Sequence, residues 1–206
     1  MSLSERLAQA AANPDRAVGV TAALLRGWLY RVWFAVTGRR VVIGRNFRVE
    51  GRLVVRGPGR VLIGDDVTIG MRVTPWTYHQ NAVITIGNRC FLNGTRFGCA
   101  SEIWIGADSI VAEAHILDTN FHSTARDRRS PEARPRVAPV RIERNVWIAA
   151  NAGILPGTRI GENSVVGFGA VCAGEYPADS LIAGNPARVV RAVEESSRPE
   201  EPDAGH

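Results

Sequence analysis

Lysine is absent from this chain of 206 residues, so all 25 of its basic residues are arginine. This absence excludes any mechanism in which a lysine amine acts as a Schiff-base nucleophile or proton carrier. The formal net charge is +5. Residues 194–206 hold five acids and one arginine, a net −4, which leaves +9 on the rest of the chain. A basic body favours an anionic partner, such as a phosphorylated cofactor, a polyanion or a membrane surface.

Cysteine is scarce, and its spacing shows no metal-binding pattern. The three cysteines are odd in number and form no C-x-x-C pair, so neither a disulfide framework nor a zinc ribbon is expected. A reducing compartment suits them best. The N-terminus also lacks the apolar stretch that opens a signal peptide. We therefore expect a cytoplasmic protein, with the inner face of the membrane as a further location. The cysteines are Cys90, Cys99 and Cys172.

A long apolar run without charge is missing as well. Val18–Val36 has the length of a transmembrane helix, but Arg26 and Arg31 fall inside it. Each would cost about 2.5–3.5 kcal/mol near the bilayer centre, so a spanning helix is not expected. Residues 1–40 are instead predicted to be a helical segment. Its apolar stripe caps one end of the core or contacts a membrane surface, and the two roles are compatible. The stripe consists of Leu25, Leu29, Val32 and Val36, with Trp28 and Trp33 beside it.

The second half of the chain contains a repeat of six residues. In a helix, six residues advance by about 600°, so successive repeat positions would share no face. In a strand, six is an even step and every repeat position faces the same side. Such a ladder, with small residues between its rungs, indicates a parallel β-helix of hexapeptide coils. The rungs are Ile142, Ile148, Ile154, Ile160, Val166 and Cys172, and the small or β-branched positions are Val146, Ala152, Thr158, Ser164 and Ala170.

Shorter runs of the same repeat precede this ladder, which predicts an all-β domain over residues 41–191. Glycines follow several rungs and are expected to allow tight corners. The largest break predicts an extruded loop over residues 119–141, and residues 192–206 are predicted to be a disordered acidic tail. Since the core of a solenoid is apolar, chemistry is expected at the break and on outward positions. The earlier rungs are Ile63, Ile69, Ile86, Leu92, Ile105, Val111 and Leu117.

Residues Asn145–Arg191 closely resemble the C-terminal half of the hexapeptide acyltransferases. The resemblance covers roughly Ile63–Arg191, and its most specific parts are V-W-I, D-T-N-F-H and G-N-P-A. The chain is most similar to the galactoside and maltose acetyltransferases and to the polysaccharide O-acetyltransferases. The resemblance implies a homotrimer of left-handed coils with active sites between subunits. It also implies transfer of an acetyl group from acetyl-CoA to a hydroxyl of a sugar or polysaccharide precursor, without a metal.

By this resemblance, His122 in D-T-N-F-H is the general base. A neutral imidazole can take the proton of a sugar hydroxyl while the hydroxyl attacks an activated thioester. Asp118, four residues earlier, has two interpretations that the sequence does not separate. It orients the imidazole as in a catalytic triad, or it shapes the entrance of the loop as a turn residue.

The resemblance also assigns residues that contact the acceptor and the thioester. Asn93 matches an asparagine that contacts the acceptor sugar, although a corner role in a coil is the alternative. An aspartate that contacts the acceptor in the family has no clear counterpart here: Ser101 or Glu102 stands near its position, and the local register is one residue short. The N–H of Ala150 matches a donor to the tetrahedral oxyanion. Trp147 either lines the groove of the acyl donor or packs across coil faces.

Four further residues match the CoA site of the family. Arg188 and Arg191 correspond to basic residues on the phosphates, a role that suits the planar guanidinium, with solvated surface charge as the alternative. Gly167 and Ala173 lie where the pantetheine arm runs, and small residues let it approach the backbone. The arginine-rich break loop is either solvated or binds an anion.

Two other functions are compatible with the same coils. A γ-class carbonic anhydrase binds zinc through three histidines between subunits, and His79, His115 and His122 supply that number. However, the hexad phase places His115 inward, in a packing position. A non-catalytic trimeric scaffold would have no need for the D-T-N-F-H histidine or the CoA arginines. Nucleic-acid binding is not expected, because the chain has no reader motif.

Overall fold

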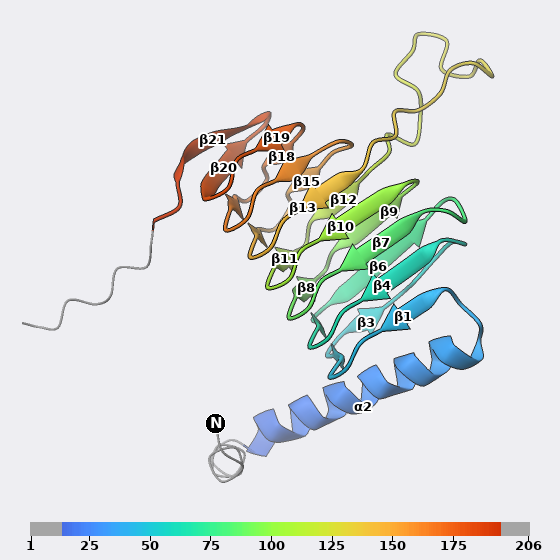
Figure 1. Ribbon diagram of the computed structural model, residues 1–206, viewed down its shortest axis with the longest axis vertical. Helices are drawn as coiled ribbons and strands as arrows, with labels where there is room; N and C mark the ends of the chain where they lie inside the picture. The colour runs from blue at the N-terminus through green and yellow to red at the C-terminus, as the bar shows by residue number, and fades with distance from the viewer. Residues whose placement is uncertain (1–13, 195–206) are drawn as a thin grey trace, which may run out of the picture.

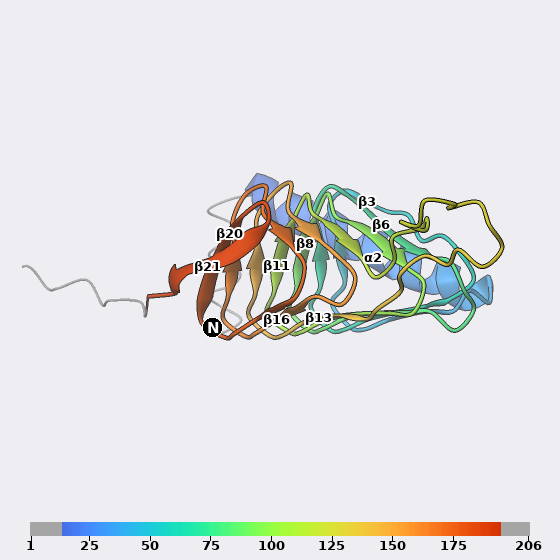
Figure 2. The same ribbon diagram turned by 90° about the horizontal axis from the view of Figure 1, so that it is seen from above.

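The computed structural model describes residues 14–194, with side chains from residue 18 onward. Short parallel strands wind around one axis as a solenoid, with a helix at one end and a loop projecting from one side (Figure 1). Seen from above, the strands form successive coils that stack behind one another (Figure 2). The strands fall into three sheets, which we call faces 1, 2 and 3 in the order in which the chain visits them. The edges are named by the faces that they join.

The hydrogen-bonded order of the strands defines each face. Face 1 contains β1 (Val41–Ile43), β4 (Arg60–Ile63), β7 (Val83–Ile86), β10 (Glu102–Ile105), β13 (Val140–Ile142), β16 (Arg159–Ile160) and β19 (Glu175–Tyr176). Face 2 contains β2 (Arg48–Val49), β5 (Thr68–Ile69), β8 (Phe91–Asn93), β11 (Ile110–Ala112), β14 (Trp147–Ile148), β17 (Val165–Val166), β20 (Ser180–Gly184) and β21 (Ala187–Ala192). Face 3 contains β3 (Arg52–Leu53), β6 (Arg72–Thr77), β9 (Arg96–Cys99), β12 (His115–Leu117), β15 (Gly153–Ile154) and β18 (Val171–Cys172).

The predicted ladder forms the core. All six rungs of the second half and all five small positions between them are buried. The hydroxyls among the small residues are satisfied by backbone carbonyls, as for Thr158, whose Oγ1 donates to Cys172 at 3.0 Å. A buried hydroxyl without such a partner would cost stability. The hexapeptide interpretation of the sequence is confirmed.

One predicted rung is wrong by a single residue. Ile116 is fully buried and pairs with Ile154 of the next coil, whereas Leu117 is only half-buried. The step from Val111 to Ile116 is five residues rather than six, because the corner at Glu113, with a φ of 45°, is one residue short. This slip moves the following side chains of β12 to the opposite sides of face 3.

The glycines after the rungs permit close stacking of coils rather than an unusual φ. A Cβ on Gly106 would lie 2.5 Å from the backbone nitrogen of Arg144, and one on Gly87 would lie 2.5 Å from that of Ala107. A methyl group cannot be accommodated at such distances. At these corners the left-handed conformation is taken three residues after the last residue of each strand of face 1, mostly by asparagine and aspartate, which tolerate it best. These positions are Asn46, Asp66, Asp108, Asn145, Asn163 and Asp179.

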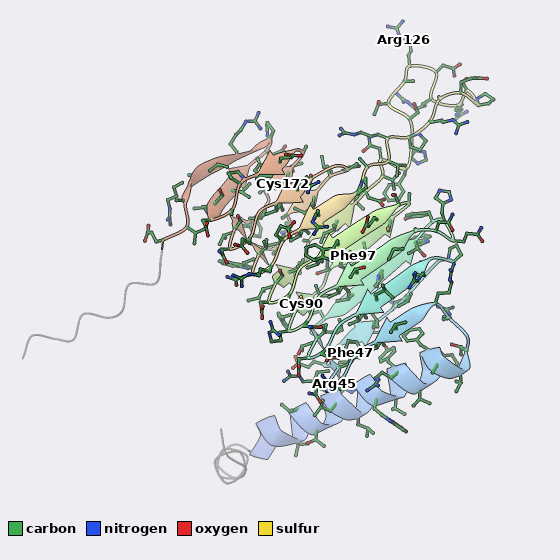
Figure 3. The ribbon with its side chains drawn as sticks, viewed as in Figure 1. Arg45, Phe47, Cys90, Phe97, Arg126 and Cys172 are labelled. Carbon is green, nitrogen blue, oxygen red and sulfur yellow. The ribbon has the colours of Figure 1, made fainter. Side chains whose placement is uncertain are left out.

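Helix α2 (Pro14–Val36) lies across the first coil (Figure 1). Ala23 and Phe34 face the coils and are buried, and the backbone of Gly27 packs against Phe47, which lies beside the helix in Figure 3. The Tyr30 hydroxyl accepts a hydrogen bond from a backbone N–H of face 3. This spacing of three and four residues is that of one helix face.

The apolar stripe predicted on this segment is not the face that caps the core. Its members are all exposed, as are both tryptophans beside it, because the small residues of the opposite face allow a closer approach to the coils. A second apolar face of α2 therefore stays uncovered in the single chain. The exposed residues are Leu25 (58%), Trp28 (56%), Leu29 (52%), Val32 (39%), Trp33 (60%) and Val36 (74%).

The extruded loop leaves the 3–1 edge after β12 (Figure 1). Its two ends are tied by an antiparallel bridge between Thr119 and Val137 and by a hydrogen bond from Asn120 to Arg136. Arg126 lies at the far tip of the loop (Figure 3). Since β13 begins at Val140, the last two residues of the predicted break belong to face 1.

The C-terminal end of the solenoid is closed by β21, which turns back antiparallel along β20. Most of the predicted acidic tail, residues 195–206, lies outside the described residues, as do residues 1–13. Within residues 14–194, no helix is long and apolar enough to cross a membrane.

Candidate active site

His122 lies at the root of the extruded loop, on the 3–1 edge. The chain turns sharply after β12: the N–H of His122 donates to the carbonyl of Asn120 at 2.6 Å, and the N–H of Phe121 donates to the hydroxyl of Thr119. Phe121 has a φ of 59°, which is rare for an aromatic residue and indicates a constrained turn. The turn leaves the imidazole of His122 exposed.

A cavity of about 660 Å³ lies beside this imidazole. Leu155 and Pro156, from the corner of the next coil, line it together with Arg128 of the loop. No aspartate or glutamate is among its lining residues. The cavity therefore has room for a hydroxyl-bearing molecule next to the His122 imidazole. The guanidinium of Arg128 is the charged group that such a molecule would contact.

Asp118 is fully buried, and its carboxylate is occupied by the backbone of the preceding coil. It accepts hydrogen bonds from the N–H groups of Ala100 and Ser101, each at 2.7 Å, and from the thiol of Cys99 at 3.4 Å. Among the described residues, no hydrogen bond joins Asp118 to the imidazole of His122. Of the two interpretations of Asp118, the geometry favours the structural one, because the carboxylate fixes the corner that faces the loop.

Ala150 lies on the 2–3 edge and carries an N–H that is available to a ligand. Its carbonyl accepts a hydrogen bond from Gly169 at 3.0 Å, and its neighbours Ala149 and Asn151 donate to adjacent coils. In residues 14–194, the N–H of Ala150 itself donates to no protein acceptor. An unpaired N–H at a partly exposed corner can bind an oxyanion.

Trp147 and Gly167 flank Ala150. Trp147 is outward on β14, 49% exposed, and Gly167 follows β17, the next strand of face 2. Arg188 on β21 pairs with Ala183, whose Cβ lies 3.4 Å from a Cβ placed on Gly167. These residues of distant sequence positions therefore line one continuous edge of the solenoid.

Asn93 lies on the same 2–3 edge, one coil before the Ala112 corner. Its side-chain carbonyl accepts a hydrogen bond from the N–H of Met71 at 2.8 Å, so part of its polar capacity supports the preceding coil. The corner interpretation of Asn93 thus has a defined contact. Its amide nitrogen donates to no acceptor in residues 14–194 and is available to a ligand.

Arg191 and Ala173 are less closely associated with this edge. Arg191 pairs across the strands with Leu181 and forms an ion pair of 2.8 Å with Glu194. Ala173 follows β18 at the 3–1 edge, where its N–H donates to the hydroxyl of Tyr176. The structure therefore separates Ala173 from Gly167, although the sequence had placed both on the path of one ligand.

His122 and Ala150 lie on opposite edges of face 3. Ala150 is at the corner where face 2 turns into face 3, beside Glu113, whereas His122 follows the far end of β12. At about 3.3 Å per residue, the intervening strand sets the two edges roughly 15–20 Å apart. A single chain therefore does not bring the imidazole to the oxyanion donor.

The outward face of β6, β9 and β12 carries one residue whose predicted orientation is wrong and one, Tyr78, that the sequence did not single out. His115, predicted to point inward, is exposed here, because the slipped corner gives the inward position to Ala114. Tyr78 lies beneath the loop against Phe121, and burial raises its pKa, with the Asp118 carboxylate adding to the shift. The signal in the sequence was the alternation of R-V-T-P-W-T-Y, residues 72–78, in which every second residue points outward.

Residues 14–194 contain no group of three histidine, cysteine, aspartate or glutamate side chains placed to hold a metal. His79 and His122 lie two coils apart on the 3–1 edge, His115 lies on the outward side of face 3, and the three form no metal-binding group within the described residues. Burial raises the pKa of the Cys90 and Cys172 thiols to about 11, which makes them poor metal ligands and nucleophiles at neutral pH.

Comparison with known proteins agrees with the geometry. Residues 139–174 match the model of the bacterial transferase hexapeptide (six repeats). The chain is 25% identical over 167 residues to Escherichia coli K12 WbbJ, assigned as an O-acetyl transferase of lipopolysaccharide biosynthesis, and covers 85% of that protein. This alignment takes in 74% of the present chain.

Two further proteins are similar. A Schizosaccharomyces pombe protein assigned as an acetyltransferase is 45% identical over 118 residues, which are 57% of this chain and 47% of that protein. The crystal structure of the polysialic acid O-acetyltransferase OatWY superposes with a TM-score of 0.66 at 26% identity and 79% coverage of both chains.

Proposed function

We propose that this chain, a member of the hexapeptide-repeat acetyltransferases, moves an acetyl group from acetyl-CoA to a hydroxyl of a sugar or polysaccharide acceptor. The alignment of Trp147, Ala150 and Gly167 along one edge supports this function best. This edge offers an exposed aromatic ring, a free N–H and a corner without a side chain. Arg188, at the end of the same edge, has the fork geometry that suits phosphate oxygens.

The proposed chemistry needs only groups of this chain and its two substrates. The imidazole of His122 takes the proton of the acceptor hydroxyl as its oxygen attacks the thioester carbon. The N–H of Ala150 donates to the oxyanion of the tetrahedral intermediate, and stabilisation of this kind is worth about 3–4 kcal/mol in other enzymes. Collapse of the intermediate breaks the carbon–sulfur bond, and the imidazolium returns its proton to the leaving thiolate.

The separation of His122 from Ala150 supports an active site shared between two copies of the chain. The 2–3 edge of one copy would meet the 3–1 edge and extruded loop of its neighbour, and three such contacts close a ring. We propose a homotrimer with three such sites. Asp118 holds the corner under the loop in this scheme, and so it positions His122 rather than contacting the substrate.

The apolar stripe of α2 fits contact with a membrane surface. Its exposed side chains include Trp28 and Trp33, and no acidic residue occurs between Arg16 and Arg48. Basic helices with tryptophan on the apolar face lie in the interface of anionic bilayers. We propose that α2 holds the enzyme at such a surface, close to a lipid-linked or exported saccharide.

The first experiment measures thiol release from acetyl-CoA with a panel of sugars and polysaccharide fragments. His122→Ala should lower kcat by a factor of about 10² or more, the usual range for a general base. His79→Ala is the control, because His79 is also an exposed histidine of the 3–1 edge but lies two coils earlier and does not line the cavity beside His122. Equal rates for wild type and His122→Ala would remove this residue from the mechanism.

Coexpressed variants test the shared site. Trp147→Ala should weaken acetyl-CoA use on one edge, and His122→Ala should remove the base from the other. If each site takes one edge from each of two copies, mixed oligomers regain part of the activity that both parents lack. Light scattering on the wild type should give the mass of three chains, and a monomer with full activity would contradict the shared site.

Flotation with vesicles tests the membrane contact. Vesicles with anionic lipid should carry the wild type, and the double substitution Trp28→Ser and Trp33→Ser should abolish flotation without loss of turnover on a soluble acceptor. If the substitutions instead change the oligomeric mass, the stripe joins copies of the chain and the membrane proposal is wrong.

A further inference from the structure

A second cavity, separate from the one that touches His122, lies on the outward side of face 3. It has a volume of about 380 Å³ and is formed by β6, β9 and β12 together with residues 54–56 that follow β3. Leu117 and Phe121 line both this groove and the cavity beside His122. A molecule lying in the groove would therefore extend to the imidazole.

The groove is cationic without any compensating acid. Arg56, Arg72 and Arg96 line it, His115 stands next to Arg96 on the neighbouring strand, and no aspartate or glutamate is among the lining residues. None of the three arginines forms an ion pair within the described residues. Five other arginines of the described residues are paired with acids, as Arg45 and Arg89 are with aspartates at 2.8 and 2.5 Å.

The clustering of positive charge is unfavourable for folding alone. Arg72 pairs directly across the strands with Arg52, and like charges at facing positions destabilise a sheet. A purely structural surface would be expected to alternate charges, as the ion pairs on the 1–2 edge do. An uncompensated row of arginines in a concave site indicates an anionic ligand.

The floor of the groove is aromatic. Trp76 stacks on Tyr78 with 5.2 Å between ring centroids, Tyr78 meets the edge of Phe121 at 5.0 Å, and the Arg56 guanidinium lies 5.4 Å from the Trp76 ring. Trp76 and Phe121 remain about two-fifths exposed, at 40% and 39%. Flat, partly exposed rings beside hydrogen-bond donors suit the apolar face of a sugar ring.

We infer that this groove binds an acidic saccharide, with Arg56, Arg72 and Arg96 on its carboxylates and Trp76 and Phe121 under its rings. The inference rests on the proposed function, since it specifies the acceptor class that reaches His122 from this side. Carboxylates are chosen over phosphates because the three arginines belong to three successive coils, so that they can contact separate acidic groups along an extended glycan. A compact phosphate would engage only one of them.

Calorimetric titration of the full chain without acetyl-CoA tests this site independently of turnover. The probes are an oligomer of galacturonic acid, a neutral maltooligosaccharide of equal length, and inorganic tripolyphosphate. The acidic sugar should bind at least tenfold more tightly than the neutral one, and its affinity should fall as salt rises. Tripolyphosphate should bind more weakly than the acidic sugar, because it has no ring to place on Trp76.

Matched variants identify the residues. Arg72→Gln and Arg96→Gln should each weaken binding of the acidic sugar roughly tenfold, because each removes a charge-assisted hydrogen bond. Arg159→Gln is the control, since Arg159 is an exposed arginine on the outward side of face 1. Thermal melting of the Arg96 and Arg159 variants should match the wild type, as expected for exposed positions. The Arg72 variant should melt at the same temperature or slightly higher, because the change removes the repulsion between Arg72 and Arg52.

The possible failures are distinguishable. Equal affinity for the acidic and neutral sugars, or equal losses in the variant of Arg159, would overturn the acidic-saccharide site while leaving the His122 result intact. Equally tight, arginine-dependent binding of tripolyphosphate would make it a phosphate site and also overturn the assignment. If acidic sugar binds as expected but acetyl-CoA is never turned over, the site stands and the transferase proposal fails.

Discussion

The ring of Phe121 lies directly over Gly98, so that a Cβ on residue 98 would come within 2.5 Å of the ring's Cζ. Gly98 is on β9, one coil before the strand that leads to the loop, and Phe121 is next to His122. The missing side chain therefore sets the position of the turn that carries the imidazole. This contact links a strand of the coils to the candidate base.

Substituting Gly98→Ala should push the Phe121 ring outward and move His122 with it. We expect kcat to fall by about 10- to 100-fold, because small displacements of a catalytic group are costly. The melting temperature should change little, since the end of an exposed ring can shift. Gly153→Ala is the control: it lies on the same face, and its Cβ would meet only Val171 at 3.9 Å. Equal kinetic losses for both variants would refute this coupling.

Replacement of Asp118 should mainly lower the stability of the fold, because its carboxylate accepts hydrogen bonds from the backbone. Asp118→Ala leaves the part-buried N–H groups of Ala100 and Ser101 without acceptors, which should cost about 2–4 kcal/mol of unfolding free energy. Asp118→Asn keeps one carbonyl acceptor and should cost less. Denaturant unfolding measures both. If Asp118→Asn keeps full stability but loses activity as completely as His122→Ala, a direct triad role is the better interpretation.

Helix α2 should be held to the first coil through its small residues. A Cβ on Gly27 would overlap the carbonyl oxygen of Phe47, so Gly27→Ala should displace the helix and lower the melting temperature by several degrees. Gly19→Ala, where nothing lies within 4 Å, should instead stabilise the helix by about 0.5–1 kcal/mol. Thermal melts of the two variants give the comparison. A melting temperature for Gly27→Ala at or above that of the wild type would show that the helix does not pack as described.

The buried cysteines predict loss of stability at alkaline pH. Burial raises the pKa of Cys90 and Cys172 to about 11 and that of Cys99 above its usual range, with the Asp118 carboxylate adding to the last shift. The unfolded thiols ionise near 8.5–9, so stability is complete below that pH and declines as the pH rises toward 11. Each thiol should remove up to about 1.4 kcal/mol per pH unit in this window.

Urea unfolding at pH 7.5, 9 and 10 measures this decline, and Cys90→Ala should reduce its slope. At pH 7.5 the native protein should also resist thiol reagents that modify it rapidly once unfolded. Fast labelling of the folded protein would mean that the thiols are not buried.

The sequence predicted the coils well because their signal is local and repeated. Each rung from Ile142 to Cys172 is buried, and no contact with a distant residue was needed to find it. The prediction from the repeat failed at the corner around Glu113. This corner is one residue shorter than the repeat predicts, which places Ile116 inward and His115 outward. A period of six cannot show such a slip, because the length of one corner is decided by how it stacks on its neighbours.

The packing of helix α2 also depends on tertiary contacts that the sequence pattern does not show. The most apolar stripe of α2 had two compatible predicted roles, to cap the core or to contact a membrane surface. The core is instead covered by Ala23, Gly27 and Phe34, because a coil accepts a helix closely where small side chains such as Ala23 and Gly27 face it. The hydrophobic pattern predicted the helix and its amphipathic character. It did not reveal which of two apolar faces meets the coils.

Sequence alone determined the β-helix, its extruded loop and the candidates His122, Ala150 and Trp147. Periodicity and the order of motifs are properties of the sequence itself and can be read without knowing the contacts between coils. Only the tertiary structure decided that Asp118 is occupied by the backbone of Ala100 and Ser101. It alone also set His122 and Ala150 on opposite edges and assembled an arginine groove from strands far apart in the chain. The physical reason is that coil stacking brings together residues separated by one whole turn, and the length of each turn depends on its own corners and loops.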